Sequence, residues 1–352
     1  MLLARREALP KQWYLSNFGM NYLVTQLKKE YPWLREVDAT MFSNTTRYFH
    51  DGFQRWFKRQ NQIPQKKKRT WAQSATSNAV NGNIKVLDAH HLQAPRMEVV
   101  SFRAGRLPAG RIEQLPLHQN AVGQYYASVL CECENQSLAQ TGKRIGGDLG
   151  LKALLNLSDG QKEPLVRYNK QLSKQLRRWD KQPAWRRIGA EAETARDQHE
   201  HPGNVRTLAD FKTYQCARGM VAKLKAHAAN QRLDQLQKYT TRLVKTYDVI
   251  VLEDLNVKGL LKNHRLARAI SNASWSKLVM MIRYKCAWYG KQLILVSPAY
   301  TSQICACCGA KNDLLSQWLK VREWDCPSCG VHLDRDTNAA QNILVKGNKQ
   351  IA

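Results

Sequence analysis

Apolar residues in the first part of the chain recur with the period of an α-helix. The segments "NYLVTQLKKEYPWL" and "ATMFSNTTRYFHDGFQRWFKRQ" place them three and four positions apart, which predicts amphipathic helices within residues 1–60. A basic run without periodicity follows, "QIPQKKKRTWAQS". Because Trp56, Phe57 and Trp71 flank this run, two interpretations stay open. It is a solvated linker, or it contacts phosphates while the aromatic rings stack on bases.

From about residue 80 to 140 the pattern changes to short runs typical of β-strands. "NIKVLDA", "MEVVSFRA" and "QYYASVLCECE" are separated by Gly, Pro and Asn, as in a small barrel or sandwich. No cluster of catalytic residue types occurs there, so this region is interpreted as a scaffold for binding.

The second half mixes strand and helix patterns, which predicts an α/β fold. "RIGGDLGLKALLNL" gives two strands with a break between them, and "RYNKQLSKQLRRWDKQPAWRR" a basic helix. We expect a connector near residues 190–203, with a loop at Pro202-Gly203, and a long helix over residues 211–246. "YDVIVLEDLN" and "KQLILVSP" predict two more strands, and "TNAAQNILVK" a last helix.

The net charge of the chain indicates which type of partner it binds. The 352 residues carry 55 Lys and Arg against 28 Asp and Glu, a net charge of +27, which favours a polyanion such as nucleic acid. The excess is spread over both halves: residues 1–140 hold 19 basic and 10 acidic side chains. No apolar run is long enough to span a membrane, and the start "MLLARREALPKQWYLSN" lacks the apolar region of a signal peptide. A cytoplasmic, nucleoid-associated protein is therefore expected.

Five of the nine cysteines crowd into one segment, where two Cys-x2-Cys pairs lie 17 residues apart. This spacing predicts a structural zinc ribbon with Cys305, Cys308, Cys326 and Cys329 as ligands, because four thiolates close the coordination sphere of Zn²⁺. Cys307 cannot form the same knuckle with Cys305 and is interpreted as a bystander.

Three acidic residues stand at the ends of predicted elements. Asp148 lies in the first strand, Glu253 ends the buried run before Asp254, and Asp336 opens the last helix. Each has an ordinary structural explanation as a turn residue, a solvated strand end or a helix N-cap. Together they predict a site for two Mg²⁺ ions that cleaves phosphodiesters.

These residues also lie in segments that resemble a known family. "GGDLGLKALLNLSDG", "VLEDLNVKGL", "YTSQICACCG" and "CGVHLDRDTNAAQNI" look like the successive signatures of the transposon-encoded TnpB (OrfB) proteins, which are relatives of the type V CRISPR effectors. The resemblance is clear from about residue 140 to 345, and upstream "LPAGRI" and "QYYASV" look like the family's barrel domain. The chain departs from the family by opening in helix instead of a barrel strand, and by Gly147 where an apolar residue commonly precedes the Asp.

The resemblance implies a RuvC-like nuclease of RNase H fold, with an inserted zinc ribbon and with Asp148, Glu253 and Asp336 as catalytic acids; Asp334 is then a flanking residue. It implies an RNA-guided, Mg²⁺-dependent DNA endonuclease that binds a guide RNA from the transposon end. Such an enzyme cuts double-stranded DNA beside a short adjacent motif. Basic side chains expected on the nucleic-acid backbone are Lys66, Lys67, Lys68, Arg177, Arg178, Arg186 and Arg187.

The expected domains are a helical segment over residues 1–75, a β-barrel over 76–140 and the nuclease with a helical insertion over 141–302. The zinc ribbon follows over 303–331, and the last nuclease motif with its helix over 332–352. Two other functions stay open: a nuclease-inactive, RNA-guided repressor, and a transposase that needs no RNA. A zinc-ribbon binding module alone would leave the three acids unexplained.

Overall fold

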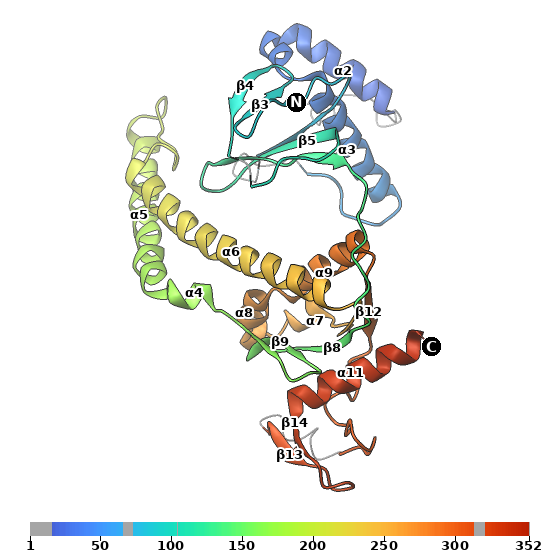
Figure 1. The fold of residues 1–352 in the computed structure, drawn as a ribbon. Helices are drawn as coiled ribbons and strands as arrows, with labels where there is room; N and C mark the ends of the chain where they lie inside the picture. Colours follow the sequence, from blue (N-terminus) through green and yellow to red (C-terminus); the bar gives the residue numbers. More distant parts are fainter. Residues whose placement is uncertain (1–15, 66–72, 104, 313–320, 352) are drawn as a thin grey trace. The chain divides into compact units, whose positions relative to one another are not determined.

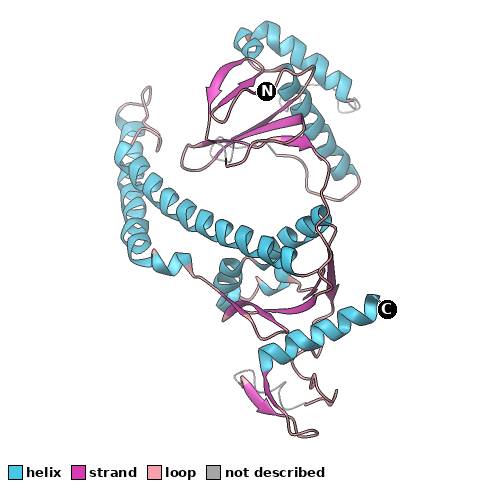
Figure 2. Ribbon diagram, in the orientation of Figure 1, coloured by secondary structure: helices cyan, strands magenta, loops and turns pink. Residues whose placement is uncertain are grey.

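The computed structural model describes residues 16–65, 73–103, 105–312 and 321–351. The chain divides into two compact units, Met1–Glu134 and Asn135–Ala352. Each is described by itself below, with element labels as in Figure 1 and helices and strands distinguished by colour in Figure 2.

The first unit joins helices to antiparallel strands. Its helices are α2 (Asn17–Glu30), η1 (Pro32–Glu36) and α3 (Ala39–Phe57), in agreement with the helical periodicity of this segment. Asp38 caps α3 by accepting the Thr40 N–H at 3.2 Å, and its carboxylate also accepts the Ser77 hydroxyl of β1 at 2.5 Å. Capping and packing against β1 therefore depend on the same carboxylate.

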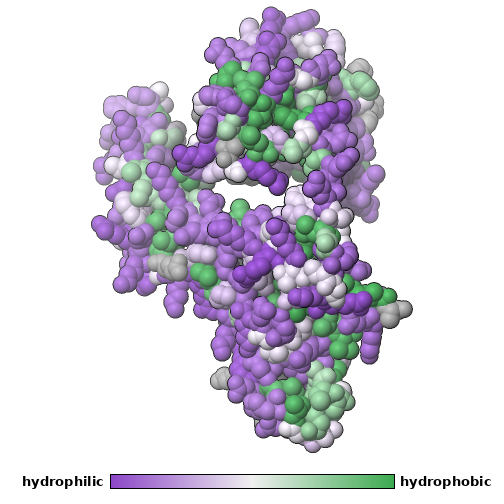
Figure 3. Space-filling model, in the orientation of Figure 1, coloured by the Kyte–Doolittle hydropathy of each residue, from purple (hydrophilic) through white to green (hydrophobic). Residues whose placement is uncertain are grey.

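The strands of the first unit form two antiparallel sheets. One contains β1 (Gln73–Asn78), β5 (Arg111–Gln119), β6 (Tyr125–Ala127) and β7 (Leu130–Glu132); the other contains β2 (Lys85–Val86), β3 (His91–Ala94) and β4 (Met97–Ser101). Ile84, Leu92, Ala94 and Leu115 form their buried core. Met97, Val99 and Val100 of β4 remain exposed, and Figure 3 shows green side chains over this sheet. Closure into a barrel stays a prediction.

The second unit is built on a five-stranded sheet in the order β10-β9-β8-β11-β12. Its strands are β8 (Arg144–Leu149), β9 (Ala153–Leu157), β10 (Lys162–Pro164), β11 (Val249–Glu253) and β12 (Gln292–Val296). The first three are antiparallel, whereas β11 runs parallel to both β8 and β12. All residues of β11 are buried, as expected for an apolar run at the centre of a parallel pairing.

Helices cover both faces of this sheet. On one face α6 (Lys212–Thr246) and α9 (Trp275–Tyr289) bury Leu236, Leu278 and Ile250, and on the other α11 (Arg335–Ile351) packs Ile343 against Val251. The remaining helices are α4 (Tyr168–Gln171), α5 (Ser173–Glu200), α7 (Val257–Leu260) and α8 (His264–Ala273). Figure 1 shows α5 and α6 as a long hairpin that leaves the sheet.

The long helix predicted over residues 211–246 is confirmed by α6. The connector expected from residue 190 is wrong, because α5 continues to Glu200. Its last part, "AEAETARDQHE", contains Ala and Glu, which are strong helix formers, and Ala190 is buried. The loop begins only at His201, just before the Pro202-Gly203 pair.

Two glycines in β8 allow its neighbours to approach closely. A Cβ on Gly146 would lie 2.2 Å from the Ala340 carbonyl oxygen of α11, and one on Gly147 would lie 2.8 Å from a methyl group of Leu252. The departure from the family pattern at Gly147 thus has a packing reason in this chain. No larger side chain fits at either position without movement of the backbone or the core.

We expect Gly146→Ala to destabilise the protein by about 1–3 kcal/mol, because the new methyl group overlaps the backbone of α11. Urea unfolding monitored by circular dichroism measures this change. Gly189→Ala is the matched control: nothing lies within 4 Å of its Cβ position, and alanine at this helical site should stabilise slightly. Equal stabilities for the two variants would show that the close approach at Gly146 is unimportant.

Candidate carboxylate site and cysteine cluster

Three carboxylates from separate elements line one cleft of about 330 Å³. Asp148 belongs to β8, Glu253 is the last residue of β11, and Asp336 lies in the first turn of α11. Gly147 pairs with Leu252 in the parallel β8–β11 ladder, so the residues that follow them, Asp148 and Glu253, lie at the same edge of the sheet. The structure therefore brings together the three acids that the sequence singles out.

Burial and mutual repulsion make this cleft unfavourable for negative charge. Burial, followed by the charges of Glu253 and Asp336, raises the pKa of Asp148 to about 7. Asn156 opposes this shift, since its amide nitrogen lies 3.4 Å from the Asp148 carboxylate. Burial also raises the pKa of Glu253, and the hydrogen bond from Thr301 Oγ1 at 2.7 Å opposes it. A cation in the cleft would relieve this repulsion.

The two aspartates of the "LDRDT" segment have different structural roles. Asp334 accepts the Thr337 N–H at 2.8 Å, which is the contact of a helix N-cap, and pairs with Lys162 at 2.8 Å. Asp336, two residues later, lines the cleft. The capping role considered for Asp336 is thus filled by Asp334, which leaves the Asp336 carboxylate facing the other two acids.

Two arginines line the same cleft. Arg322 Nη1 lies 3.1 Å from Asp336 Oδ1, and Arg335 Nη2 donates to Ser302 Oγ at 3.4 Å. The charge of Arg335 also lowers the pKa of Asp148. A site that contains both carboxylates and guanidinium groups can bind a metal ion and an anionic substrate together.

The donor set fits a hard cation. Carboxylate oxygens are the protein ligands that Mg²⁺ prefers, and Mg²⁺ keeps several waters when one or two carboxylates bind it. Asn156 faces Asp148 with its amide nitrogen, and its buried Oδ1 atom has no partner among the described residues. Asn156, Thr301, Arg322 and Arg335 were not predicted from the sequence, although Thr301 belongs to the quoted "YTSQICACCG" segment.

The four predicted zinc ligands come together in the structure. The Sγ atoms of Cys305, Cys308, Cys326 and Cys329 all lie within 4.8 Å of one another, and the Cys305–Cys329 and Cys308–Cys326 separations are 3.8 and 3.6 Å. A tetrahedral zinc with Zn–S bonds of about 2.3 Å sets its ligands about 3.8 Å apart. The cluster could therefore hold Zn²⁺, whereas Cys307 is exposed and lies outside it.

Each cysteine pair forms the same type of turn. Gly309 donates its N–H to the Cys305 carbonyl at 2.9 Å, and Gly330 donates to the Cys326 carbonyl at 2.8 Å. Both glycines have positive φ angles, 77° and 68°, which other residues rarely adopt. The short strands β13 (Glu323–Asp325) and β14 (His332–Asp334) pair beside the cluster.

Two buried asparagines of α11 connect the cysteine segment to the carboxylate cleft. Asn338 donates to the Ile304 carbonyl at 2.7 Å and accepts the Ala306 N–H at 2.8 Å. Asn342 donates to the carbonyl of Thr301, the residue whose hydroxyl group contacts Glu253, at 2.9 Å. The start of the cysteine segment is therefore fixed to the helix that carries Asp336.

The predicted nucleic-acid contacts have mixed environments. Lys66, Lys67 and Lys68 lie outside the described residues. On α5, Arg177 and Arg178 are exposed, Arg187 pairs with Glu191 at 2.7 Å, and Arg186 donates to the Thr213 carbonyl of α6 at 2.8 Å. Arg186 thus connects the two helices of the hairpin, and the role of all seven residues in binding nucleic acid stays a prediction.

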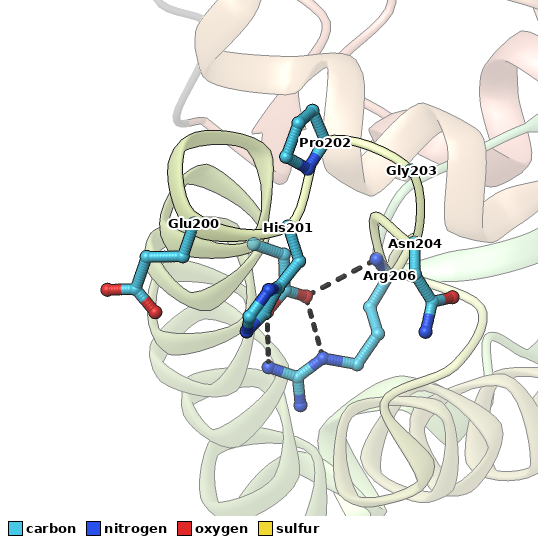
Figure 4. Close-up of a pocket in the computed structure, with 7 residues that line it drawn as sticks. Glu200, His201, Pro202, Gly203, Asn204 and Arg206 are labelled. Atoms are coloured by element: carbon cyan, nitrogen blue, oxygen red, sulfur yellow. Dashed lines mark hydrogen bonds and ion pairs between the residues drawn. The ribbon is translucent and has the colours of Figure 1, made fainter.

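A second hollow, of about 720 Å³, lies where α5 and α6 are joined, and Figure 4 shows its lining. Arg206 forms three hydrogen bonds to Asp197, two from its guanidinium group at 2.7 and 2.9 Å and one from its backbone N–H at 3.3 Å, and holds the loop against the end of α5. These bonds keep the pKa of Asp197 below its usual value. The hollow contains none of the three carboxylates and is interpreted as part of the loop structure.

Comparison with known proteins gives two family matches. Residues 128–264 match the family described as "Probable transposase" (OrfB of IS605 elements), and residues 275–343 match the "Cas12f1-like, TNB domain". A Streptomyces pristinaespiralis protein named "Putative RNA-guided DNA endonuclease" is 30% identical, covering 97% of this chain and 81% of its own length. The "Putative RNA-guided DNA endonuclease InsQ" of Escherichia coli (strain K12) is 26% identical, covering 92% and 78%.

Among solved structures, a Cas12f1–sgRNA–target DNA complex is similar with a TM-score of 0.37 and 11% identity, covering 97% of this chain and 89% of that one. The identity and coverage of the sequence relatives establish the class: a transposon-associated protein of the OrfB kind. The chain belongs to the TnpB family. The resemblance noted from its motifs is confirmed.

Within the described residues, no helix is both long and apolar enough to cross a membrane.

The raised pKa of Asp148 predicts a pH-dependent stability in buffer free of Mg²⁺. Between its unfolded value near 3.8 and about 7, the folded form binds a proton that the unfolded form lacks, so stability falls as pH rises. Asp148→Asn should remove most of this decline. At pH 8 its free energy of unfolding should exceed that of the wild type by up to about 4 kcal/mol. Urea unfolding across this range measures the effect.

Asp254→Asn is the control, because Asp254 is exposed beside Glu253 and does not line the carboxylate cleft. It should keep the wild-type pH dependence. Addition of Mg²⁺ should stabilise the wild type and not Asp148→Asn. Parallel pH profiles for the wild type and Asp148→Asn would contradict the electrostatic interpretation.

For the cysteine cluster, we expect Cys326→Ser to lose bound zinc and Cys307→Ser to retain it, since only Cys326 belongs to the four-thiolate group. Atomic absorption on the purified proteins measures the zinc content. Because a structural zinc contributes folding free energy, Cys326→Ser should also be protease-sensitive between residues 300 and 335. An equal zinc loss in both variants would rule out this ligand set.

Proposed function

We propose that this protein is an RNA-guided, Mg²⁺-dependent endonuclease that cuts double-stranded DNA complementary to a bound guide RNA. The observation that carries the proposal is the meeting of Asp148, Glu253 and Asp336 in one cleft of a chain with a net charge of +27. The names of the Streptomyces and Escherichia coli relatives agree with it.

We infer further that the second unit is a RuvC-like nuclease of the RNase H fold with an inserted zinc ribbon. Support comes from its mixed sheet, in which three antiparallel strands precede two parallel ones, and from the cysteine cluster between β12 and α11. In the first unit, we assign the helices to the helical segment expected over residues 1–75, and the two sheets to the β-barrel expected over residues 76–140. The guide RNA would come from the transposon end, and cutting would need a short adjacent DNA motif.

In this site Asp148, Glu253 and Asp336 would hold two Mg²⁺ ions. When bound, such ions activate the attacking water and stabilise the leaving oxygen of the phosphodiester. Thr301 orients the Glu253 carboxylate through its hydroxyl group, and Asp334 fixes the first turn of α11, where Asp336 lies. Arg322 and Arg335 supply positive charge for the phosphate that is cut.

The test is cleavage by the protein purified with its own RNA. After sequencing of that RNA, the complex is incubated with Mg²⁺ and a plasmid that carries the matching sequence, flanked by randomised DNA. Asp148→Ala, Glu253→Ala and Asp336→Ala should each lower the cleavage rate by at least about a hundredfold, because each removes a ligand from a shared metal site.

Asp334→Asn is the matched control for Asp336→Ala. Asn caps a helix about as well as Asp does, so the first turn of α11 should stay in place and cleavage should remain nearly intact. Matched DNA binding without cutting by the wild type would favour the repressor. Cutting that needs no RNA would favour the conventional transposase.

A further inference from the structure

A further cleft in the second unit, of about 850 Å³, lies among α4, α5, α6 and α8. It is separate from the carboxylate cleft and from the hollow at the end of α5. Seven basic residues line it: Arg167, Lys170, Arg177, Lys225, Arg232, Arg265 and Arg268. Among the described residues that line it, Asp180 is the one acidic residue, and it lies 3.4 Å from Lys225. We call this feature the basic cleft. Figure 1 shows its four helices where the α5–α6 hairpin joins the sheet.

The spacing of the lining residues shows that each long helix contributes one face. On α6, Lys225, Ala229 and Arg232 are four and three positions apart, and on α8, Arg265 and Arg268 are three apart. Short side chains such as Ala229 and Ala269 lie between the basic ones and leave the space open. The basic residues therefore converge from several directions on a common volume.

These charges are poorly neutralised within the chain. Among the described residues, the Lys225–Asp180 contact is the one ion pair made by any of the seven. Arg232 is half-buried, and its Nε atom has no hydrogen-bond partner in the described part of the chain; its Nη2 group contacts the neutral Asn272 Oδ1 at 3.4 Å. Burial lowers the pKa of Arg232, as expected for a cation without a nearby counter-charge.

From this geometry we propose that the basic cleft binds the phosphodiester backbone of a single-stranded nucleic-acid segment. The arrangement suits several phosphates in succession, because guanidinium groups from α5, α6 and α8 face one space and Arg pairs well with phosphate. The volume lies within the range of sites that enclose a drug-sized molecule, so it accommodates a few nucleotides of a flexible strand. No lining residue is shared with the carboxylate cleft.

This inference rests on the proposed function only in that both assign nucleic acid as the partner. Guide RNA and the unpaired DNA strand present the same phosphate chemistry, so the experiments use both. Binding is measured with labelled, unstructured RNA and DNA oligonucleotides of about 12 nucleotides, within the site sizes of single-strand binders.

A triple variant, Arg177→Gln with Arg265→Gln and Arg268→Gln, removes three exposed charges from the cleft. For the oligonucleotide that occupies the cleft, the slope of log affinity against log salt is negative and should become less steep by about 2. Each lost phosphate contact accounts for about 0.7 on a single strand. The control is Lys245→Gln with Lys277→Gln and Lys349→Gln, which removes the same charge from exposed positions outside the cleft. It should change the slope little.

Chemical footprinting of the wild-type protein tests the same site without any substitution. An amine-reactive acetylating reagent should modify Lys170 and Lys225 in the free protein, and binding of the oligonucleotide should protect both, read out by mass spectrometry. Lys277 and Lys349 should react equally with and without it. Protection by RNA, by DNA or by both supports the proposal and identifies the source.

Unchanged labelling of Lys170 and Lys225 by both oligonucleotides would overturn the proposal, as would equal salt slopes for the cleft and control variants. Both assays measure binding in the absence of Mg²⁺, so their outcome is independent of cleavage. A complex that cuts matched DNA while its basic cleft stays unprotected would retain the proposed function and refute this inference alone.

Discussion

The close contact between the backbones of α11 and β8 is the constraint on which the candidate site depends. At Gly146 no side chain separates the strand from the helix, and Gly347 of α11 similarly faces Val251 of β11. Because α11 carries Asp336 and β8 carries Asp148, the packing distance between the two elements sets the position of the third carboxylate relative to the sheet. Asn338 and Asn342 add buried hydrogen bonds that fix the same helix to the cysteine segment.

The electrostatic properties of the cleft follow from this packing. Three acids that meet in a partly buried space cannot all be ionised at low cost, so the folded protein keeps a proton on Asp148 up to a pH near 7. The same groups become favourable when a divalent cation enters. The chain thus combines an acidic centre, which is unstable alone, with a basic exterior that attracts phosphates.

Much of the second unit could be predicted from sequence because its signals are local. The run Val249–Leu252 is apolar throughout and forms the buried centre of the sheet, and the paired cysteines define their own turns. The polar strand β1 and the Pro-containing β5 were missed, since neither shows the β-branched alternation of a typical strand. They are held by pairing with each other, which is a tertiary effect.

The residues that support the carboxylate site also depend on tertiary structure and could not be predicted from the sequence. Thr301 is 48 residues from Glu253, and Asn156 meets Asp148 only through the pairing of β8 with β9. Arg322 reaches Asp336 only because the cysteine segment folds back on α11. The basic cleft has a sequence signal, basic residues three and four apart on α6 and α8. Only the packing of those helices shows that the two faces meet.

The position of α11 also has a consequence for synthesis of the protein. This helix follows every strand of the sheet, and it covers Val249, Val251, Ile294 and Val296 on one face. Before the ribosome has made α11, that face is uncovered and the nascent chain holds two of the three acids. The helix that brings the third acid to the candidate site is therefore the one that covers this apolar face of the sheet. A chain interrupted before α11 leaves that face exposed, and exposed apolar surface makes a nascent protein prone to aggregate.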